Sequence, residues 1–244
     1  MENVLTLTRS KVAPAVSSPA SVLESAVRSE AECCRRCPQL VNSRSQVVFG
    51  SGPTDAALMF VGEAPGARED QEGAPFVGAS GKLLDQLLAG IELSREDVYI
   101  ANVLKCRPPD NRDPRADEIS NCFEYLQRQV EIVEPTVVVT LGNFASKLLR
   151  NDDTAISTIR GTPGICQIGA RTVWLLPVFH PAAALYRRPN LELLRDDFEL
   201  LPSLVSRGAP DQKQAASVSR EEAGDVETSA PPDSEDDRPQ LDLF

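Results

Sequence analysis

Glu63, Asn102 and His180 each stand at the end of an apolar segment that is typical of a buried strand. The carboxyl ends of parallel strands meet at one edge of a sheet, so these residues are expected in one crevice. An asparagine amide offers a donor beside an acceptor, which matches the edge of a nucleobase. His180 is the only histidine in the chain, and its place between a strand and Pro181 favours a functional role over a structural one.

A loop rich in glycine and proline follows the first of these strands, within the stretch from Phe60 to Gly81. Backbone amides of such loops can hold anions, but its four carboxylates argue against a simple phosphate cradle. Lys82 is followed by Leu83 rather than by serine or threonine, which excludes a Walker P-loop. The length of the loop, its prolines and its one aromatic residue, Phe76, favour a ligand site over a plain connection.

Four of the six cysteines have a spacing that suits a metal site: Cys34, Cys37, Cys106 and Cys122. Four thiolates suit either zinc or a four-iron cluster, and the spacing does not separate the two. Cys33 is a rival for Cys34 as a ligand. Cys166, in an apolar hairpin, is expected to be an ordinary buried thiol.

The elements that must position these groups alternate between strands and helices. Strands are predicted at 57–62, 98–103, 136–141 and 174–179, a hairpin at 161–173, and helices at 21–36, 82–89, 114–131, 142–149 and 191–204. This alternation predicts an α/β fold, with a mostly parallel sheet and helices on both of its faces.

The composition predicts an intracellular protein whose ends differ from its middle. The net charge is −11, of which residues 207–244 contribute −6, so the remaining body can still carry a local basic surface. No apolar run is long enough to span a membrane, and no signal peptide is recognisable. Residues 1–20 are expected to be flexible, and residues 207–239 to form a disordered acidic linker before a short apolar end at 240–244.

Together the motifs resemble those of the family 4 uracil-DNA glycosylases, the iron–sulfur type. The resemblance covers about residues 30–205 and rests on GEAPG (62–66) with Glu69-Asp70, GAPFVGASG (73–81), Asn102 with KCRPP (105–109), HPAAAL (180–185) and the spaced cysteines. It implies that residues 21–206 form a three-layer α/β/α sandwich around a four-stranded parallel sheet. It also implies a structural [4Fe-4S] cluster on Cys34, Cys37, Cys106 and Cys122.

The resemblance further implies hydrolysis of the N-glycosidic bond of deoxyuridine flipped out of single- or double-stranded DNA, the first step of base-excision repair. Phe76 would stack on the base, Asn102 would read its edge, and His180 would hydrogen-bond to O2. The segment Gly62, Glu63 and Ala64 would supply backbone contacts, with Glu63 placed to exclude the methyl group of thymine.

A carboxylate is expected to orient the attacking water, with Glu69 as the first candidate and Glu63 as the second. Ala64 departs from the classical glycosylases, which carry an aspartate at that position. Leu185 is expected to enter the minor groove from a loop at 182–189. The alternative for this segment is the start of a helix with solvated arginines. The expected phosphate contacts are Arg187, Arg188, Lys105, Arg107 and Arg112.

The last five residues resemble the peptide that binds the bacterial sliding clamp. Leu241, Leu243 and Phe244 would fill an apolar groove on the clamp, and Gln240 would bond its rim. A disordered linker would then hold the enzyme near DNA and raise its effective concentration there. The prediction is therefore a monomeric, clamp-tethered enzyme of the bacterial cytoplasm, associated with the nucleoid and not with a membrane.

Two other classes of function compete with this interpretation. One is a non-turnover protein that binds uracil-containing DNA, or recruits others to it, with the same pocket and clamp peptide. The other is a four-cysteine redox or zinc sensor, for which the pocket motifs would be accidental.

Overall fold

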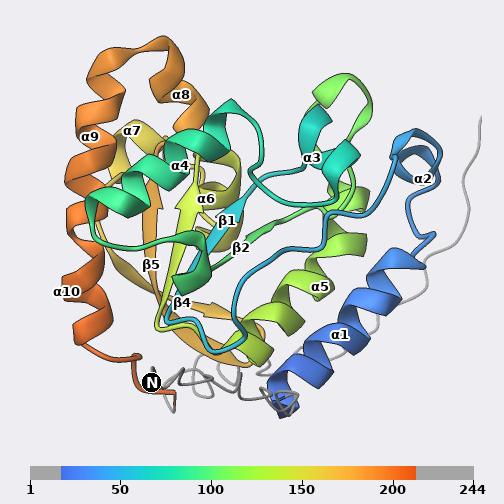
Figure 1. Ribbon diagram of the computed structural model, residues 1–244, viewed down its shortest axis with the longest axis horizontal. Coiled ribbons are helices and arrows are strands. Elements are labelled where there is room, and N and C mark those ends of the chain that lie inside the picture. The colour runs from blue at the N-terminus through green and yellow to red at the C-terminus, as the bar shows by residue number, and fades with distance from the viewer. Residues whose placement is uncertain (1–17, 213–244) are drawn as a thin grey trace, which may run out of the picture. The chain divides into compact units, whose positions relative to one another are not determined.

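A computed structural model describes residues 18–212 (Figure 1). The expectations for residues 1–17, for the linker beyond Gln212 and for the terminal peptide at 240–244 lie outside the described residues. No helix among the described residues is long and apolar enough to cross a membrane.

One five-stranded sheet organises the described part of the chain, with strand order β2-β1-β3-β5-β4. The strands are β1 (Leu58–Gly62), β2 (Val98–Asn102), β3 (Val137–Leu141), β4 (Gly164–Ile168) and β5 (Arg171–Val178). β2, β1, β3 and β5 run parallel, which confirms the predicted four-stranded parallel core. β4 adds an antiparallel edge strand from the predicted hairpin.

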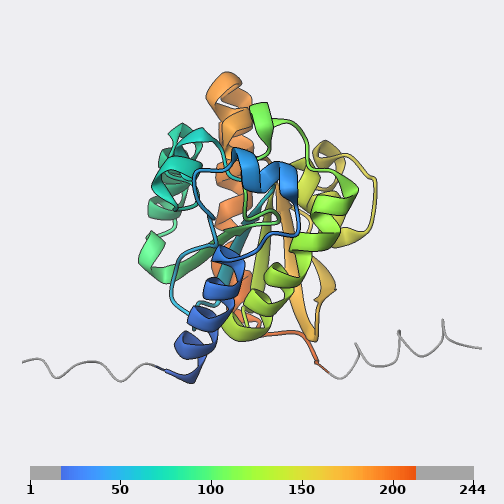
Figure 2. The same cartoon turned by 90° about the vertical axis from the view of Figure 1, so that its right-hand side faces the viewer.

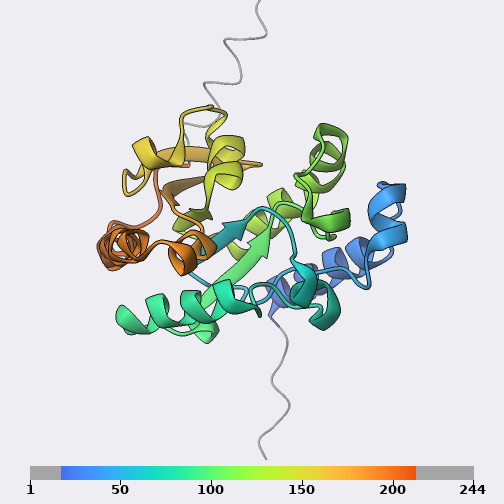
Figure 3. The same ribbon diagram turned by 90° about the horizontal axis from the view of Figure 1, so that it is seen from above.

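Helices cover both faces of the sheet (Figure 3). They are α1 (Pro19–Glu32), α2 (Pro38–Ser43), α3 (Ala67–Glu72), α4 (Ala79–Gly90), α5 (Ala116–Val133), α6 (Asn143–Arg150), α7 (Ile156–Ile159), α8 (Pro181–Tyr186), α9 (Arg188–Glu199) and α10 (Leu201–Ser206). Short 3-10 turns lie at Arg95–Asp97 and Pro109–Asn111.

The strands are buried on both sides, so their successive side chains enter two different cores. Phe60 and Ile100 belong to a core that includes α4, α8, α9 and α10. Val61 and Tyr99 belong to a core that includes α5 and α6. The predicted three-layer α/β/α architecture is therefore confirmed.

A third apolar cluster lies beside the sheet rather than on it, between α1, α2 and α5. Figure 2 views the molecule from the side on which α1 and α2 lie. This cluster contains Cys106 and Cys122, with Cys34 and Cys37 packed against it. The cysteines thus belong to a separate small core.

Several boundaries differ from the sequence-based predictions. α1 begins at Pro19 because Ser18, not Ser21, is its N-cap, and it ends before the cysteines. The loop predicted after His180 is instead the helix α8. The chain also stays packed on β5 beyond residue 206, since Trp174 Nε1 donates to Gly208 O and Gln212 exchanges hydrogen bonds with the Thr172 backbone.

Candidate active site

A small cavity of about 150 Å³ lies at the carboxyl ends of β1, β2 and β5. It is lined by Ala64, Gly66, Glu69, Phe76, Ser80, Asn102 and His180. Phe76, Asn102 and His180, which are far apart in sequence, therefore meet around one space. Ser80 was not singled out from the sequence, because only the fold of the loop into α4 brings it to this cavity.

Asn102 ends β2 directly beside Gly62 of β1, with which it is in register. Its side chain is almost completely buried, yet no group in residues 18–212 hydrogen-bonds to its amide. A Cβ on Gly62 would stand 2.4 Å from Asn102 Oδ1 and 2.8 Å from Phe76 Cζ. Glycine at position 62 therefore allows both side chains to reach the cavity. The sequence had suggested only backbone contacts for Gly62.

Phe76 is held in a backbone conformation that non-glycine residues rarely adopt, with φ +53°. The carbonyls of Pro75 and Phe76 accept hydrogen bonds from Arg95. Glu69 Oε1 accepts the backbone N–H groups of Val77 and Gly78, each at 3.0 Å. These contacts fix the loop and hold the Phe76 ring in place at the cavity.

His180 is the N-cap of α8, and its Nδ1 accepts the backbone N–H of Ala182 at 3.1 Å. Burial lowers the pKa of His180 to about 4, although the nearby Glu69 opposes that shift. The imidazole is therefore neutral at pH 7, and because Nδ1 is an acceptor its proton lies on Nε2. The ring stacks on Phe76 with centroids 5.6 Å apart and planes 27° apart.

Two carboxylates flank His180 from different sides. Glu69 lines the cavity itself, whereas Glu63 lines an adjoining open cleft of about 580 Å³ that also contains His180 and Asp113. Burial raises the pKa of Glu63, and the negative charge of Asp113 raises it further. The site thus offers one carboxylate, Glu69, in the small cavity and another, Glu63, in the wider cleft.

The predicted DNA contacts on α8 lie on the surface. Leu185 is 47% exposed and the neighbouring Tyr186 is 88% exposed, while Arg187 and Arg188 are exposed beside them. Tyr186 was not singled out from the sequence, because nothing in the residues around it indicates that its ring is exposed.

Two of the predicted phosphate contacts are corrected by the structure. Lys105 is only 1% exposed and its side chain points into the protein, so its ammonium is inaccessible to DNA. Arg112 pairs with Glu118 through both of its terminal nitrogens. Arg107 is partly exposed, and its Nε donates to Asn111 Oδ1 at 2.8 Å.

The four cysteines expected to act together do lie together, although their segments are distant in sequence. The Cys106 thiolate interacts electrostatically with Cys34 and Cys37, and Cys122 with Cys37 and Cys106. Cys33 is exposed and Cys166 donates to Leu149 O, so neither belongs to the group.

Hydrogen-bond donors surround these sulfur atoms. Arg44 Nη1 donates to Cys106 Sγ at 3.0 Å, and the backbone N–H of Lys105 donates to Cys122 Sγ at 3.3 Å. Arg44 also holds Cys34 O at 3.0 Å, so it joins two of the segments. It was missed in the sequence because no motif contains it.

Burial governs the acidity of these thiols. It raises the pKa of Cys37 and of Cys106, and it raises the pKa of Cys122 to about 11. Burial acts in the same direction on Cys34, but hydrogen bonds to Arg36 and Tyr125 outweigh it and lower that pKa. Within residues 18–212 no three His, Cys, Asp or Glu side chains are grouped as a single metal ion would require.

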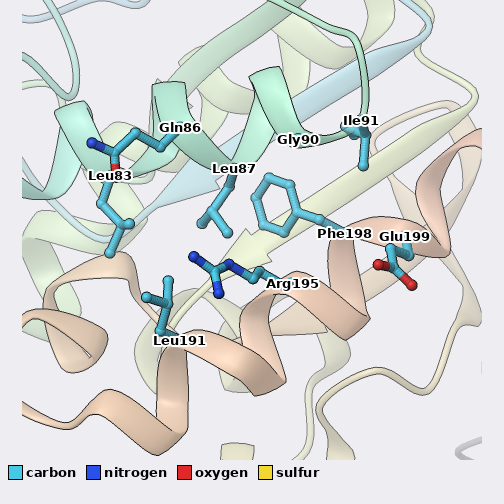
Figure 4. A pocket seen from close by; sticks show the side chains of 9 residues that line it. All are labelled: Leu83, Gln86, Leu87, Gly90, Ile91, Leu191, Arg195, Phe198 and Glu199. Atoms are coloured by element: carbon cyan, nitrogen blue, oxygen red, sulfur yellow. The ribbon is translucent and has the colours of Figure 1, made fainter.

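A second cavity, of about 140 Å³, lies between α4 and α9 and is mainly apolar (Figure 4). Leu87 and Phe198 form its floor, and Arg195 and Glu199 stand at its side. It shares no lining residue with the cavity at the strand ends, which contains Asn102 and His180 and is the candidate active site.

Comparison with known proteins gives consistent matches. Residues 49–201 match the model of the uracil DNA glycosylase superfamily. The chain is 45% identical to the type-4 uracil-DNA glycosylase of Archaeoglobus fulgidus over 181 residues, which are 72% of this chain and 90% of that protein. It is 43% identical to the type-4 enzyme of Thermotoga maritima, over 71% of this chain and 90% of that protein. A type-5 enzyme of Pyrobaculum aerophilum is 37% identical over only 46% of this chain and 62% of that protein.

Proposed function

Because the chain belongs to the uracil DNA glycosylase superfamily, in its type-4 branch, we infer that it is a DNA N-glycosylase that removes uracil from DNA. The observation that carries the assignment of residues is the meeting of an aromatic ring, an unpaired amide and a neutral imidazole around one small cavity. We propose that this cavity receives a single uracil, flipped out of the DNA.

In this proposal the base lies on Phe76 with its edges toward Asn102 and His180. The amide N–H of Asn102 donates to uracil O4, and its carbonyl accepts from N3–H. Cytosine presents the opposite pattern, so it would leave a buried amide facing mismatched groups. The 5.6 Å between the Phe76 and His180 rings leaves no room for a third ring, since stacked atoms need about 3.5 Å on each side. We propose that the base lies on the part of the Phe76 ring that His180 leaves uncovered, and that it meets the imidazole with its edge.

The reaction breaks the bond between C1′ and N1, and the electron pair stays on the base. Negative charge develops on uracil O2 while the sugar becomes cation-like. Nε2–H of neutral His180 would donate to O2, and that bond would strengthen as the charge develops. Water then adds hydroxide to C1′ and gives its proton to a carboxylate. Transfer of that proton to the departing uracil anion restores the carboxylate and leaves uracil and an abasic site.

We propose Glu69 as the first candidate for that carboxylate and Glu63 as the second. Glu69 lies in the cavity, but its Oε1 already holds two loop amides. Glu63 lies in the wider cleft beside His180, and its raised pKa suits proton acceptance. None of the residues that line the described cavity is a lysine, so we expect no Schiff base and no strand cleavage.

The exposed end of α8 is proposed to enter the DNA. Leu185 would fill the gap left by the flipped nucleotide, with Tyr186 beside it. Arg187, Arg188 and Arg107 would contact phosphates. His180 caps the same short helix, so entry of α8 into the DNA and alignment of the imidazole are mechanically linked.

Cys34, Cys37, Cys106 and Cys122 are proposed to hold a [4Fe-4S] cluster. The donor set fits, since four thiols from three chain segments converge and N–H donors point at two of the sulfurs. Each iron takes one terminal thiolate, so the sulfurs need not converge on one point. When bound, the cluster would crosslink the segments, and a brown colour would distinguish it from colourless zinc.

The terminal peptide at 240–244 is proposed to bind the sliding clamp, and a monomer acting at the nucleoid is the corresponding cellular form. Deleting residues 240–244 should abolish clamp binding in a pull-down and leave activity on short oligonucleotides intact. A fall in that activity would contradict the tether.

One assay tests the function and separates it from its rivals. The full chain is incubated with excess single- or double-stranded DNA that contains one uracil, and alkali-sensitive sites are counted. Multiple turnovers are expected. One stoichiometric retained complex would favour the non-turnover binder, and no effect would favour a sensor.

A further inference from the structure

Lys105 is an unusual buried residue in this molecule. Its side chain is 1% exposed, and its Nζ donates to Asn102 O at 2.8 Å and to Gln129 Oε1. The ammonium also lies 5.7 Å from the centre of the Phe49 ring. No carboxylate in the described part of the chain forms an ion pair with it. Burial of an ammonium without a counter-charge is unfavourable, so its hydrogen bonds must compensate for the lost hydration.

A buried network fixes the lysine in one position. Gln129 Nε2 donates to Phe49 O at 2.9 Å and to the Tyr99 hydroxyl at 3.0 Å. The Tyr99 hydroxyl donates in turn to Glu24 Oε1 at 3.1 Å. Side chains from α5, β2 and α1 therefore leave Lys105 Nζ little freedom, and its bond to the Asn102 carbonyl is rigidly held.

Lys105 also contacts the cysteine site. Lys105 precedes Cys106, and its backbone N–H donates to Cys122 Sγ at 3.3 Å. The sulfur atoms of Cys122 and Cys106 lie close enough to Lys105 to interact with it electrostatically. A single residue thus touches the cysteine site through its backbone and charge, and the end of β2 through its Nζ.

We propose that Lys105 is a positioning residue that couples the cysteine site to the recognition of the base by Asn102. The inference rests on the proposed function. Its bond to the Asn102 carbonyl fixes the end of β2, and therefore the amide that faces the cavity. Because its backbone N–H also donates to Cys122 Sγ, the two sites share one structural element.

The test uses Lys105→Met in the full chain with its cluster loaded, beside Lys82→Met as the matched control on the exposed face of α4. Affinity is measured for two duplexes that differ at one position. One carries 2′-fluoro-2′-deoxyuridine, which resists cleavage because fluorine disfavours the cation-like sugar, and the other carries thymidine. The reduction potential of the cluster is measured in the same samples.

For Lys105→Met we expect the preference for the uracil duplex to fall by about 10- to 100-fold, with unchanged affinity for the thymidine duplex. The reduction potential should move to lower values, because a positive charge beside the cluster is lost. Lys82→Met should change neither quantity. A purely structural lysine would alter stability without altering the preference.

Two results would overturn the proposal: an unchanged preference, or an equal loss of affinity for both duplexes, which is the behaviour of a phosphate contact. If Lys105→Met does not fold, Gln129→Met replaces it, because it removes one partner of Nζ and keeps the charge. A smaller loss of preference in Gln129→Met would support the proposal. An unchanged preference in this variant would overturn it. A wild-type chain without preference for uracil would instead contradict the proposed function itself.

Discussion

The base cavity and the cysteine site are built on opposite plans. In the cavity, the Asn102 amide has no partner among the described residues, and Phe76 is held in a strained conformation. At the cysteine site, Cys106 and Cys122 each accept an N–H donor. A site that must bind and release a base keeps its polar groups free, whereas a site for a permanent group satisfies them.

The two regions also differ in the parts of the fold that position their residues. The cavity depends on the ends of strands in a rigid sheet, and the cysteine site on segments that only their mutual contacts bring together. If this contrast is right, variants in the cavity should lose excision and keep the visible absorbance of the cluster. Apart from Lys105, which contacts both regions, variants around the cysteines should do the reverse.

The largest effect is expected for His180→Ala. It removes the proposed donor to uracil O2, so single-turnover excision should fall by about 100- to 1,000-fold. Affinity for undamaged DNA and the visible absorbance should remain. An equal loss of DNA binding would show that His180 supports the fold of α8 rather than the chemistry.

Gly62→Ala should have the next largest effect. The new methyl group would collide with Asn102 Oδ1 and Phe76 Cζ, and a shift of either side chain by a fraction of an ångström misaligns the base. Excision should fall by about 10- to 100-fold. Gly90→Ala is the matched control, since a Cβ there meets nothing within 4 Å, and activity equal to this control would contradict the geometry.

Tyr186→Ala should weaken excision from duplex DNA by about fivefold or more, because it loses a stacking contact with the opened duplex. Single-stranded DNA has no opposite strand whose base is left unpaired by flipping. Uracil excision from single-stranded DNA should therefore not change. Tyr186→Phe keeps the ring and should behave as wild type. Equal losses on both substrates would assign Tyr186 to the strand itself.

Arg44→Met should have the smallest effect on excision. Its main effect should be at the cysteine site. Loss of the bond to Cys106 Sγ should speed the bleaching of the visible absorbance in air, while uracil preference stays unchanged. A change in preference with a stable chromophore would break the contrast between the two regions.

Much of the fold was predictable because each strand is an apolar run with a turn at its end. The meeting of Asn102 and His180 followed from that topology alone. From the sequence, α8 was only the alternative to a loop, because six residues carry little periodicity and the helix depends on the His180 cap and Pro181 at its start.

The direction of the Lys105 side chain was wrongly predicted for a different reason. A lysine between a strand and a proline-rich loop normally faces water. Only the packing of Gln129 and Tyr99, from distant segments, makes a buried position possible. Such a tertiary contact has no local signal in the sequence.

The central claim is that a neutral imidazole presents its Nε2–H to a base in the cavity. As His180 is the only histidine, ¹⁵N-histidine labelling gives a single imidazole to observe by NMR. The account predicts an uncharged ring with its proton on Nε2 from about pH 8 down to about pH 5, whereas an ordinary histidine titrates near 6.5. That N–H signal should move when 2′-fluoro-2′-deoxyuridine DNA binds and stay in place with thymidine DNA. A titration near pH 6.5, or the same shift with both DNAs, would contradict it.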